Sequence, residues 1–218
     1  MKKLLFLFLV IFIFFESQAQ VYRNVVMGGD RMTIRSKRSD SDLQGSPYLF
    51  GDWQKAIVQF APGTEPASAE IKYDLLDDLL VLKGTDGGEY EFKDQPKEFL
   101  ISGTKELYKN GFVPVDKFTD KTFYNVIYDG KAKFLKKVSK VILESKGYNT
   151  ASVEKKVADE TAYYLVKEDN KPVKVKNEKS IIAFLGKADQ LLKYIKENRL
   201  DLKSNDGMIK LLTFYDTL

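Results

Sequence analysis

Acidic side chains are the groups of this sequence that could carry out acid–base chemistry, because the chain contains no histidine and no cysteine. These two absences exclude a Ser-His-Asp triad, a thiol nucleophile and zinc or iron–sulfur sites bound through cysteine. The sequence also lacks the glycine-rich motifs that bind dinucleotides or nucleotide phosphates. We therefore expect no cofactor and no metal.

Two carboxylates are enough for a glycoside hydrolase when they flank the sugar bond, roughly 5 to 10 Å apart. The candidate acids are Asp77, Asp78, Asp86, Glu89 and Glu91. Acids in turns and at alternate strand positions are also typical of the solvated face of a sheet. We favour that second interpretation and keep the glycoside hydrolase as the alternative.

A calcium loop is the other acidic motif. Residues 40–45 begin like the loop Asp-x-Asp-x-Asn-Gly, in which a bidentate acid follows at the twelfth position. In this chain that position is Gly51, which has no side chain, so the oxygen cage cannot close. The sequence therefore favours a plain loop.

Aromatic side chains are the positive indication of a ligand site. Tyr and Trp can line a pocket for a sugar or a lipid, since each offers an apolar face and one hydrogen-bonding group. Aromatic residues also favour strands and fill cores, and we expect core where they alternate with charged residues. The pairs Phe123-Tyr124 and Tyr163-Tyr164 differ, because consecutive strand residues point to opposite faces, so one of each pair leaves the core face. It faces either a second layer of helices or an exposed binding strip. The ligand-binding candidates are Trp53, Tyr124, Tyr128, Tyr163 and Tyr164.

A basic stretch offers a third surface. It could meet anionic lipid headgroups, or it could be a solvated edge strand guarded by lysine, since unpaired edges invite aggregation. We favour the guarded edge. The stretch consists of Lys131, Lys133, Lys136, Lys137 and Lys140.

The elements that position these residues are mostly strands. Alternating apolar and charged residues, separated by turn signals every eight to twelve residues, predict an antiparallel meander from Tyr48 onward. Asp129-Gly130 between two strand-like runs predicts a hairpin with a type I′ turn. A second hairpin is expected from Ala162–Val166 and Val173–Val175. Two short strands, at 22–27 and 32–35, are expected ahead of a Ser/Asp-rich loop. The predicted meander strands are 53–60, 71–75, 80–82, 90–92 and 99–101.

The C-terminus is predicted to be helical. A helical period places Ile181, Leu185, Ala188, Leu192 and Ile195 on one face, and Gly186 can split this segment in two. Ser204 can cap a last helix whose apolar face is Met208, Leu211, Leu212 and Tyr215.

The predicted fold is mainly β (α+β): an antiparallel β-meander, open or barrel-like, with two or three C-terminal helices packed on it. We expect a signal peptide at 1–19, a polar N-terminal segment at 20–47, an antiparallel β domain at 48–176 and a helical segment at 177–218.

The first nineteen residues have the layout of a secretory leader. Met1-Lys2-Lys3 precedes an apolar run from Leu4 to Phe15, which is short for a membrane span, and Ser17 and Ala19 are small residues at the cleavage positions. We expect cleavage after Ala19 and a periplasmic or secreted protein. A lipoprotein is excluded because no cysteine follows the leader, and no later apolar run is long enough for a transmembrane segment.

Four segments resemble a family of uncharacterised exported proteins of Bacteroidetes-type bacteria. The resemblance implies export and the β-rich architecture and assigns no catalytic residue. The segments are Gly45–Phe50 leading to Trp53, Tyr73–Asp78, Tyr128–Lys131 with Leu135–Lys137, and Tyr194–Asn198.

The function expected from these patterns is that of a non-catalytic binding or interaction module of the cell envelope, with a glycan, a lipid or an envelope protein as partner. The alternatives are the carboxylate-dependent glycoside hydrolase and a purely structural envelope protein. Nucleic acid is not expected as a partner, since a formal net charge of +4 is a mild surplus in a chain that is 30% charged.

Overall fold

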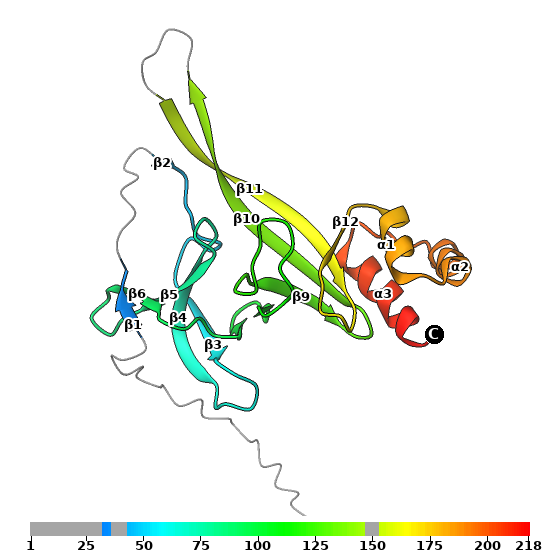
Figure 1. The fold of residues 1–218 in the computed structure, drawn as a ribbon, viewed down its shortest axis with the longest axis horizontal. Coiled ribbons are helices and arrows are strands. Elements are labelled where there is room, and N and C mark those ends of the chain that lie inside the picture. Colours follow the sequence, from blue (N-terminus) through cyan, green and yellow to red (C-terminus); the bar gives the residue numbers. More distant parts are fainter. Residues whose placement is uncertain (1–31, 36–42, 147–152) are drawn as a thin grey trace, which may run out of the picture.

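In the computed structural model, residues 32–35, 43–146 and 153–218 are described. Their strands form one sheet, and three helices follow at the C-terminal end (Figure 1). The strands are β1 (Met32–Ile34), β2 (Leu43–Gln44), β3 (Gln54–Gln59), β4 (Ala67–Asp74), β5 (Leu79–Lys83), β6 (Glu89–Phe92), β7 (Glu98–Ile101), β8 (Leu107–Lys109), β9 (Tyr124–Asp129), β10 (Lys133–Lys146), β11 (Val153–Val166) and β12 (Val173–Val175). The helices are α1 (Glu178–Leu185), α2 (Ala188–Asn198) and α3 (Asn205–Asp216).

The predicted fold class is confirmed. Neighbouring strands follow the order β1-β6-β5-β4-β3-β7-β8-β9-β10-β11-β12. These pairs are antiparallel, and β2 alone among the described strands pairs in parallel, with β11. The sheet is open, because β1 and β12 lie at its two ends.

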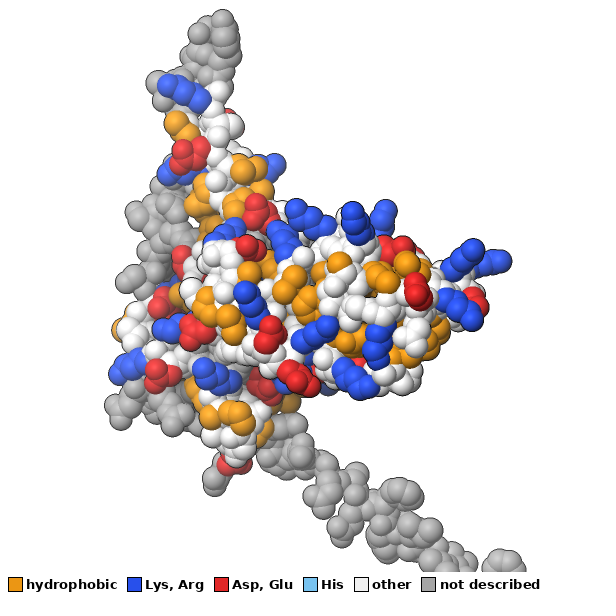
Figure 2. All heavy atoms as spheres, turned by 45° about the vertical axis from the view of Figure 1, so that its right-hand side comes forward, with side chains coloured by type: hydrophobic (Ala, Val, Ile, Leu, Met, Phe, Trp, Pro, Cys, Tyr) orange, Lys and Arg blue, Asp and Glu red, His pale blue; other side chains and the backbone are white. Residues whose placement is uncertain are grey.

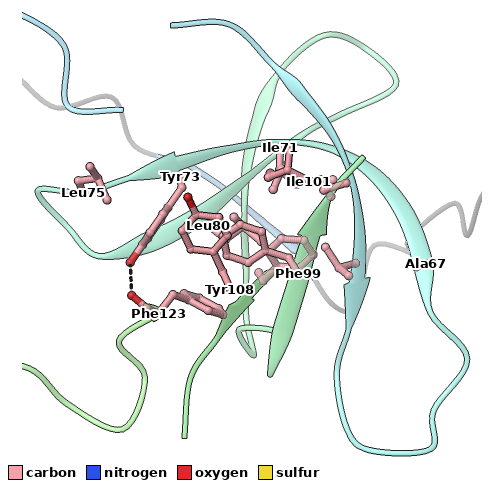
Figure 3. Close-up of a cluster of buried hydrophobic side chains, with 13 residues drawn as sticks. Ala67, Ile71, Tyr73, Leu75, Leu80, Phe99, Ile101, Tyr108 and Phe123 are labelled. Atoms are coloured by element: carbon pink, nitrogen blue, oxygen red, sulfur yellow. Dashed lines mark hydrogen bonds between the residues drawn. The ribbon is translucent and has the colours of Figure 1, made fainter. Parts of the chain in front are cut away.

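A first hydrophobic cluster fills the concave side of the N-terminal strands (Figure 3). The alternation seen in the sequence places Ala56 and Val58 of β3 and Ile71 and Tyr73 of β4 on its inner face. Phe99 of β7 stacks on Tyr108 of β8 with ring centroids 4.7 Å apart. Full burial of one such side chain contributes roughly 1.5–3 kcal/mol, so this cluster stabilises the sheet without any disulfide.

The pairing of β10 with β11 was not predicted, because the sequence pattern indicated only the start of β10, at 131–135, and the end of β11, at 162–166. Each strand has 14 residues, and the hairpin runs diagonally across the molecule (Figure 1). Its base is buried on both faces: Phe134 and Leu165 join the cluster beneath the helices, whereas Leu135 and Tyr164 join a third cluster on the opposite face. In β11 the apolar run Ala162–Val166 hides the alternation that normally identifies a half-buried strand.

The predicted turn at Asp129-Gly130 is wrong in type. Asp129 pairs directly with Lys133, so the loop has three residues, and neither Asp129 nor Gly130 has a positive φ. Glycine is needed at 130 for another reason, since an added Cβ would lie 2.1 Å from Oδ2 of Asp216 in α3.

The three helices form a second layer over β9–β12. Asn177 caps α1: its side chain accepts from the Ser180 amide at 3.0 Å, and the Ser180 hydroxyl accepts from the Asn177 amide at 3.1 Å. The Lys167 ammonium donates to the Phe184 carbonyl at 2.8 Å, satisfying the other end of α1. Ser204 caps α3, as predicted.

The single apolar face expected across residues 181–195 is wrong in its second half. The chain breaks at Gly186, and Lys187 takes a left-handed conformation, so α2 starts with a new orientation. As a result α2 buries Leu191 and Ile195, while Leu192 is 42% exposed.

The polar segment 20–47 contributes to the sheet where it is described. β1 pairs with β6, and β2 pairs with the distant hairpin strand β11 at Lys155 and Lys156. The strand predicted at 22–27 and the start of the loop tested for calcium, residues 40–42, lie outside the described residues.

Candidate functional site

The consecutive residues Tyr163 and Tyr164 of β11 point to opposite faces of the sheet, and each lines a different cavity. Tyr163 faces the helices, and Tyr164 faces the connection between β8 and β9. The expectation that one residue of this pair meets a second layer of helices is thus confirmed. The other pair differs: Phe123 and Tyr124 are both buried, in the first and the third cluster, and neither belongs to the cluster beneath the helices.

We call the first cavity the helix–sheet cavity. It has a volume of about 400 Å³ and lies between β10–β12, the start of α1, the α2–α3 loop and α3. Its walls are mostly apolar, and Figure 2 shows hydrophobic side chains with basic side chains around them on the part of the molecule that carries the helices. The apolar lining consists of Phe134, Tyr163, Val175, Ile181, Leu200, Leu202 and Met208.

Local backbone chemistry fixes the mouth of this cavity. Arg199 ends α2 in a left-handed conformation, after which the Leu200 amide donates to the Ile195 carbonyl at 3.0 Å. The loop then passes so close to α3 that a Cβ on Gly207 would lie 2.0 Å from the Asp201 carbonyl oxygen. Gly207 therefore lets Asp201 and Leu202 sit against the first turn of α3.

Polar groups stand at the floor and rim of the helix–sheet cavity. Tyr163 stacks on Phe134 with ring centroids 5.4 Å apart, and the Tyr163 hydroxyl has no hydrogen-bond partner among the described residues. The rim carries both signs of charge, with Lys176 and Lys203 beside Glu178 and Asp201. Such an arrangement can hold an apolar group while its polar end meets the rim.

The second cavity, which we call the hairpin groove, lies on the other face of β11. It has a volume of about 700 Å³, and Tyr164 forms part of its floor together with Phe118 of the β8–β9 connection. Burial and the nearby Asp116 carboxylate raise the pKa of Tyr164 to about 12. The Tyr164 hydroxyl is therefore protonated at neutral pH and can donate.

The other three predicted aromatic residues lie elsewhere. Tyr124 is buried in the third cluster, where its ring meets that of Tyr164 edge to face with centroids 5.5 Å apart. Tyr128 donates from its hydroxyl to Asp216 at 2.6 Å and so anchors α3 on β9. Trp53 lies at the N-terminal strands, and neither it nor the other two lines the helix–sheet cavity or the hairpin groove.

Trp53 forms an aromatic clamp with Tyr48 on a lysine of the chain itself. The Lys72 ammonium lies 4.8 Å from the Tyr48 ring centroid and 4.7 Å from the Trp53 ring. The Tyr48 hydroxyl donates to Glu89 at 3.1 Å. The cation–π contacts occupy both rings, so they stabilise the surface of β4 rather than leaving an open platform.

The guarded-edge interpretation of the basic stretch is wrong for Lys137. β10 lies between β9 and β11 at residues 133–136, so this part is not an edge. Lys137 is only 2% exposed, and its ammonium lies 2.6 Å from Oδ1 of Asp78 and 2.7 Å from the Tyr73 hydroxyl. Burial lowers the pKa of Lys137, and the Asp78 carboxylate acts in the opposite direction.

The five candidate acids of the hydrolase alternative are each engaged by other side chains. Asp77 and Glu91 surround the buried Arg35 at 3.1 and 3.7 Å, and Asp78 binds Lys137. Asp86 accepts from the Tyr90 hydroxyl and Glu89 from the Tyr48 hydroxyl. None of the five lines the helix–sheet cavity or the hairpin groove.

Two further observations concern the described residues only. No three Asp or Glu side chains in these ranges are grouped so that they could hold a metal ion. No helix within them combines the length and the hydropathy that crossing a bilayer takes.

Sequence patterns missed most residues of the helix–sheet cavity. Phe134 was recognisable as a strand residue, but Leu200 and Leu202 reach the cavity from the α2–α3 loop, and Met208 reaches it from α3. Their signal in the sequence, apolar residues around the predicted cap Ser204, does not say which strand they will cover.

Comparisons of the chain with protein-family models, with curated proteins and with solved structures give no match.

Proposed function

We propose that this chain is an exported, non-catalytic binding protein that takes the apolar part of a small amphipathic, lipid-like molecule into the helix–sheet cavity. The observation that carries the proposal is the cavity of about 400 Å³ that remains between the helices and the sheet. Its size falls within the range of small-molecule sites, roughly 300–1,000 Å³, whose walls are mostly apolar with a few polar groups.

The polar groups indicate what kind of head group would suit the site. The Tyr163 hydroxyl, without a partner in the described part of the chain, can hydrogen-bond an ester or hydroxyl near the apolar tail. The rim presents two lysines and two acids, Lys176, Lys203, Glu178 and Asp201, which matches a zwitterionic head better than one of a single sign.

Export is part of the same proposal. It rests on the leader-like residues 1–19 and on the resemblance to exported proteins, and it places the protein in the periplasm or outside the cell. Mass spectrometry of the protein from its native cells is expected to find a mature chain that begins at Gln20. A chain that keeps residues 1–19 would overturn export without bearing on the cavity.

Binding is tested with dodecylphosphocholine, a single-chain zwitterionic amphiphile, kept below its micelle concentration in isothermal titration calorimetry. Dodecylmaltoside, which has the same chain and a neutral head, tests whether the rim contributes. We expect saturable one-to-one binding of both, tighter for the zwitterion. Absence of saturable binding for both amphiphiles would overturn the proposal.

Two matched variants locate the binding. Leu200→Trp replaces a leucine of the cavity lining by a bulkier side chain that fills part of the cavity. Leu192→Trp makes the same change on the exposed side of α2. We expect Leu200→Trp to weaken binding at least tenfold and Leu192→Trp to leave it unchanged, with thermal unfolding confirming that both variants fold. Equal affinity of the two variants would show that the amphiphile binds elsewhere.

A further inference from the structure

The outer half of the β10–β11 hairpin has a free strand edge. β11 pairs with β10 along all 14 residues, whereas β9 pairs with the other edge of β10 at Lys133–Lys136. The β4–β5 turn follows, where the Lys140 amide donates to the Leu75 carbonyl at 3.5 Å. From 141 to 146 this edge has no strand partner among the described residues, and Figure 1 shows the hairpin projecting away from the N-terminal strands. Such an edge is a template on which a further strand can pair.

The usual protection of a strand edge is absent from residues 141–145. Natural edges are guarded by lysine, proline or a bulge, and this stretch contains none of them. Lys140, which precedes it, is held by Asp159 with Nζ and Oδ1 3.0 Å apart. Ile142 and Leu143 lie in its middle and are 39% and 55% exposed. The stretch therefore offers unpaired backbone groups together with large apolar side chains.

The backbone determines which residues can bond across the edge. In an antiparallel ladder, residues whose amide and carbonyl face one neighbouring strand alternate with residues that face the other. The Lys140 amide faces outward, so the backbone groups of Ile142 and Glu144 face outward as well. These two residues can exchange hydrogen bonds with an added strand.

A second copy of the same stretch fits this edge in one register. A two-fold axis at Leu143 sets Ile142 of each copy against Glu144 of the other, so both outward-facing residues are bonded. Leu143 then lies directly opposite its counterpart, in a pair without backbone hydrogen bonds, where side chains come closest. Pairing ends at residues 141 and 145.

The neighbouring registers are unfavourable. An axis at Ile142 would set Glu144 of the other copy against Lys140, where Leu75 already occupies the edge. An axis at Glu144 would place two carboxylates directly opposite each other.

The charges favour the antiparallel orientation. Lys140 and Glu144 flank the apolar residues with opposite signs. An antiparallel copy brings Glu144 diagonally across from Lys140, whereas a parallel copy would set each of these charges against its like. The stretch is therefore complementary to itself when one copy is turned by a two-fold axis.

We propose that two copies of this chain associate through the free edge of β10, with residues 141–145 of each copy paired antiparallel about a two-fold axis at Leu143. The two hairpins then form one continuous ribbon, and Leu143 of each copy covers the other. Because the paired stretch is short, the contact is small, and we expect a dissociation constant of about 10–100 μM. This inference does not depend on the proposed function.

Sedimentation velocity of the whole exported chain, from about 1 to 500 μM, tests the association. We expect the average mass to rise from that of a monomer to that of a dimer. Leu143→Lys sets two positive charges directly opposite each other and is expected to weaken the dimer at least tenfold. Leu192→Lys, the same change at the 42% exposed leucine of α2, is the matched control and should change nothing. A chain that stays monomeric at the highest concentration, or equal weakening by both variants, would overturn the proposal.

Cross-linking tests the position of the axis. The chain contains no cysteine, so an introduced cysteine can pair only with its counterpart in another copy. Directly opposed residues of a pair without backbone hydrogen bonds have Cα atoms about 4.5 Å apart, within the range of a disulfide. We expect mild oxidation to convert Leu143→Cys into a covalent dimer, while Val153→Cys, at a 43% exposed position of β11, stays mostly monomeric. Faster cross-linking of Val153→Cys or of Ile142→Cys than of Leu143→Cys would refute this pairing.

Discussion

Replacing Asp78 by asparagine leaves the Lys137 ammonium inside the protein without its counter-charge. Asp78 lies in the β4–β5 turn and Lys137 on β10, so their contact joins the N-terminal strands to the long hairpin. Asp78 has a φ of 54°, and asparagine tolerates this left-handed conformation as well as aspartate does. The substitution therefore tests the charge and leaves the turn intact.

The expected loss of stability follows from the surroundings of Lys137. Breaking a buried ion pair by removing one partner costs roughly 3–5 kcal/mol, because the other charge remains buried. The asparagine oxygen can still accept from the ammonium, and the Tyr73 hydroxyl stays 2.7 Å away. We therefore expect Asp78→Asn to cost about 3 kcal/mol.

The complementary substitution Lys137→Met is expected to cost less. Methionine keeps most of the side-chain volume, and the Asp78 side chain is 28% exposed, so water can solvate the carboxylate that remains. In the double variant no buried charge is left, and its loss is expected to be smaller than the sum of the two single losses by about 2 kcal/mol.

The pH dependence gives a second test. Burial lowers the pKa of Lys137 in the folded protein, and loss of Asp78 lowers it further, since that carboxylate raises it. Between this value and the unfolded value of about 10.4, the unfolded chain binds more protons, so the unfolding free energy rises with pH. Asp78→Asn is therefore expected to regain stability relative to the wild type as the pH rises from the lowered pKa of Lys137 toward about 10.4.

Urea unfolding followed by the fluorescence of Trp53, the single tryptophan, measures these effects. Asp94→Asn is the control, because Asp94 is an exposed loop residue and its replacement is expected to change stability by less than about 0.5 kcal/mol. If Asp78→Asn matches this control at every pH, Asp78 does not hold a buried cation and the reasoning is wrong.

Three further predictions concern the C-terminal half. Gly130→Ala drives a Cβ against Asp216 and is expected to cost about 1–3 kcal/mol and to speed hydrogen exchange in α3, whereas Gly103→Ala, with open space around it, should change neither. Gly207→Ala pushes the α2–α3 loop away from α3 and is expected to weaken dodecylphosphocholine binding at least fivefold, measured by calorimetry. Tyr164→Phe is expected to remove a phenol transition near pH 12 in absorbance titrations. The raised pKa of this tyrosine means that its stabilisation is complete below about pH 10 and is lost as pH rises through 12. An unchanged titration curve would contradict this assignment.

Short-range patterns predicted the strands well where one face of a strand is solvated. β3, much of β4 and β7 alternate between buried and more exposed residues, because a half-buried strand must place every second residue inside, whereas β5 buries Leu80, Val81 and Leu82 in succession. Alternation did not reveal the full length of β10 and β11, because helices cover one face of the hairpin base and the third cluster covers the other. The prediction that Leu192 lies on the buried helix face was wrong, because the backbone break at Gly186 gives the residues of α2 a new orientation.

Two residues show how tertiary contacts reassign a local signal. Gly130 suggested a turn with positive φ, but its φ is not positive. A side chain at this position would instead collide with the carboxylate of Asp216, 86 positions later in the chain. Lys137 suggested a solvated lysine, but the β4–β5 turn covers it with Asp78. Neither partner is near in sequence, so no window around either residue contains the cause.

The sequence by itself determined the mainly β class, the antiparallel meander, the helical C-terminus and its Ser204 cap, because these depend on periodicity and on capping within a few residues. It also determined that Tyr163 and Tyr164 face opposite sides, since strand geometry alone requires this. Only the tertiary structure decided that each of them lines a cavity. The two cavities exist because segments distant along the chain do not cover the sheet completely. Such gaps depend on how all the elements pack together, which no local sequence pattern contains.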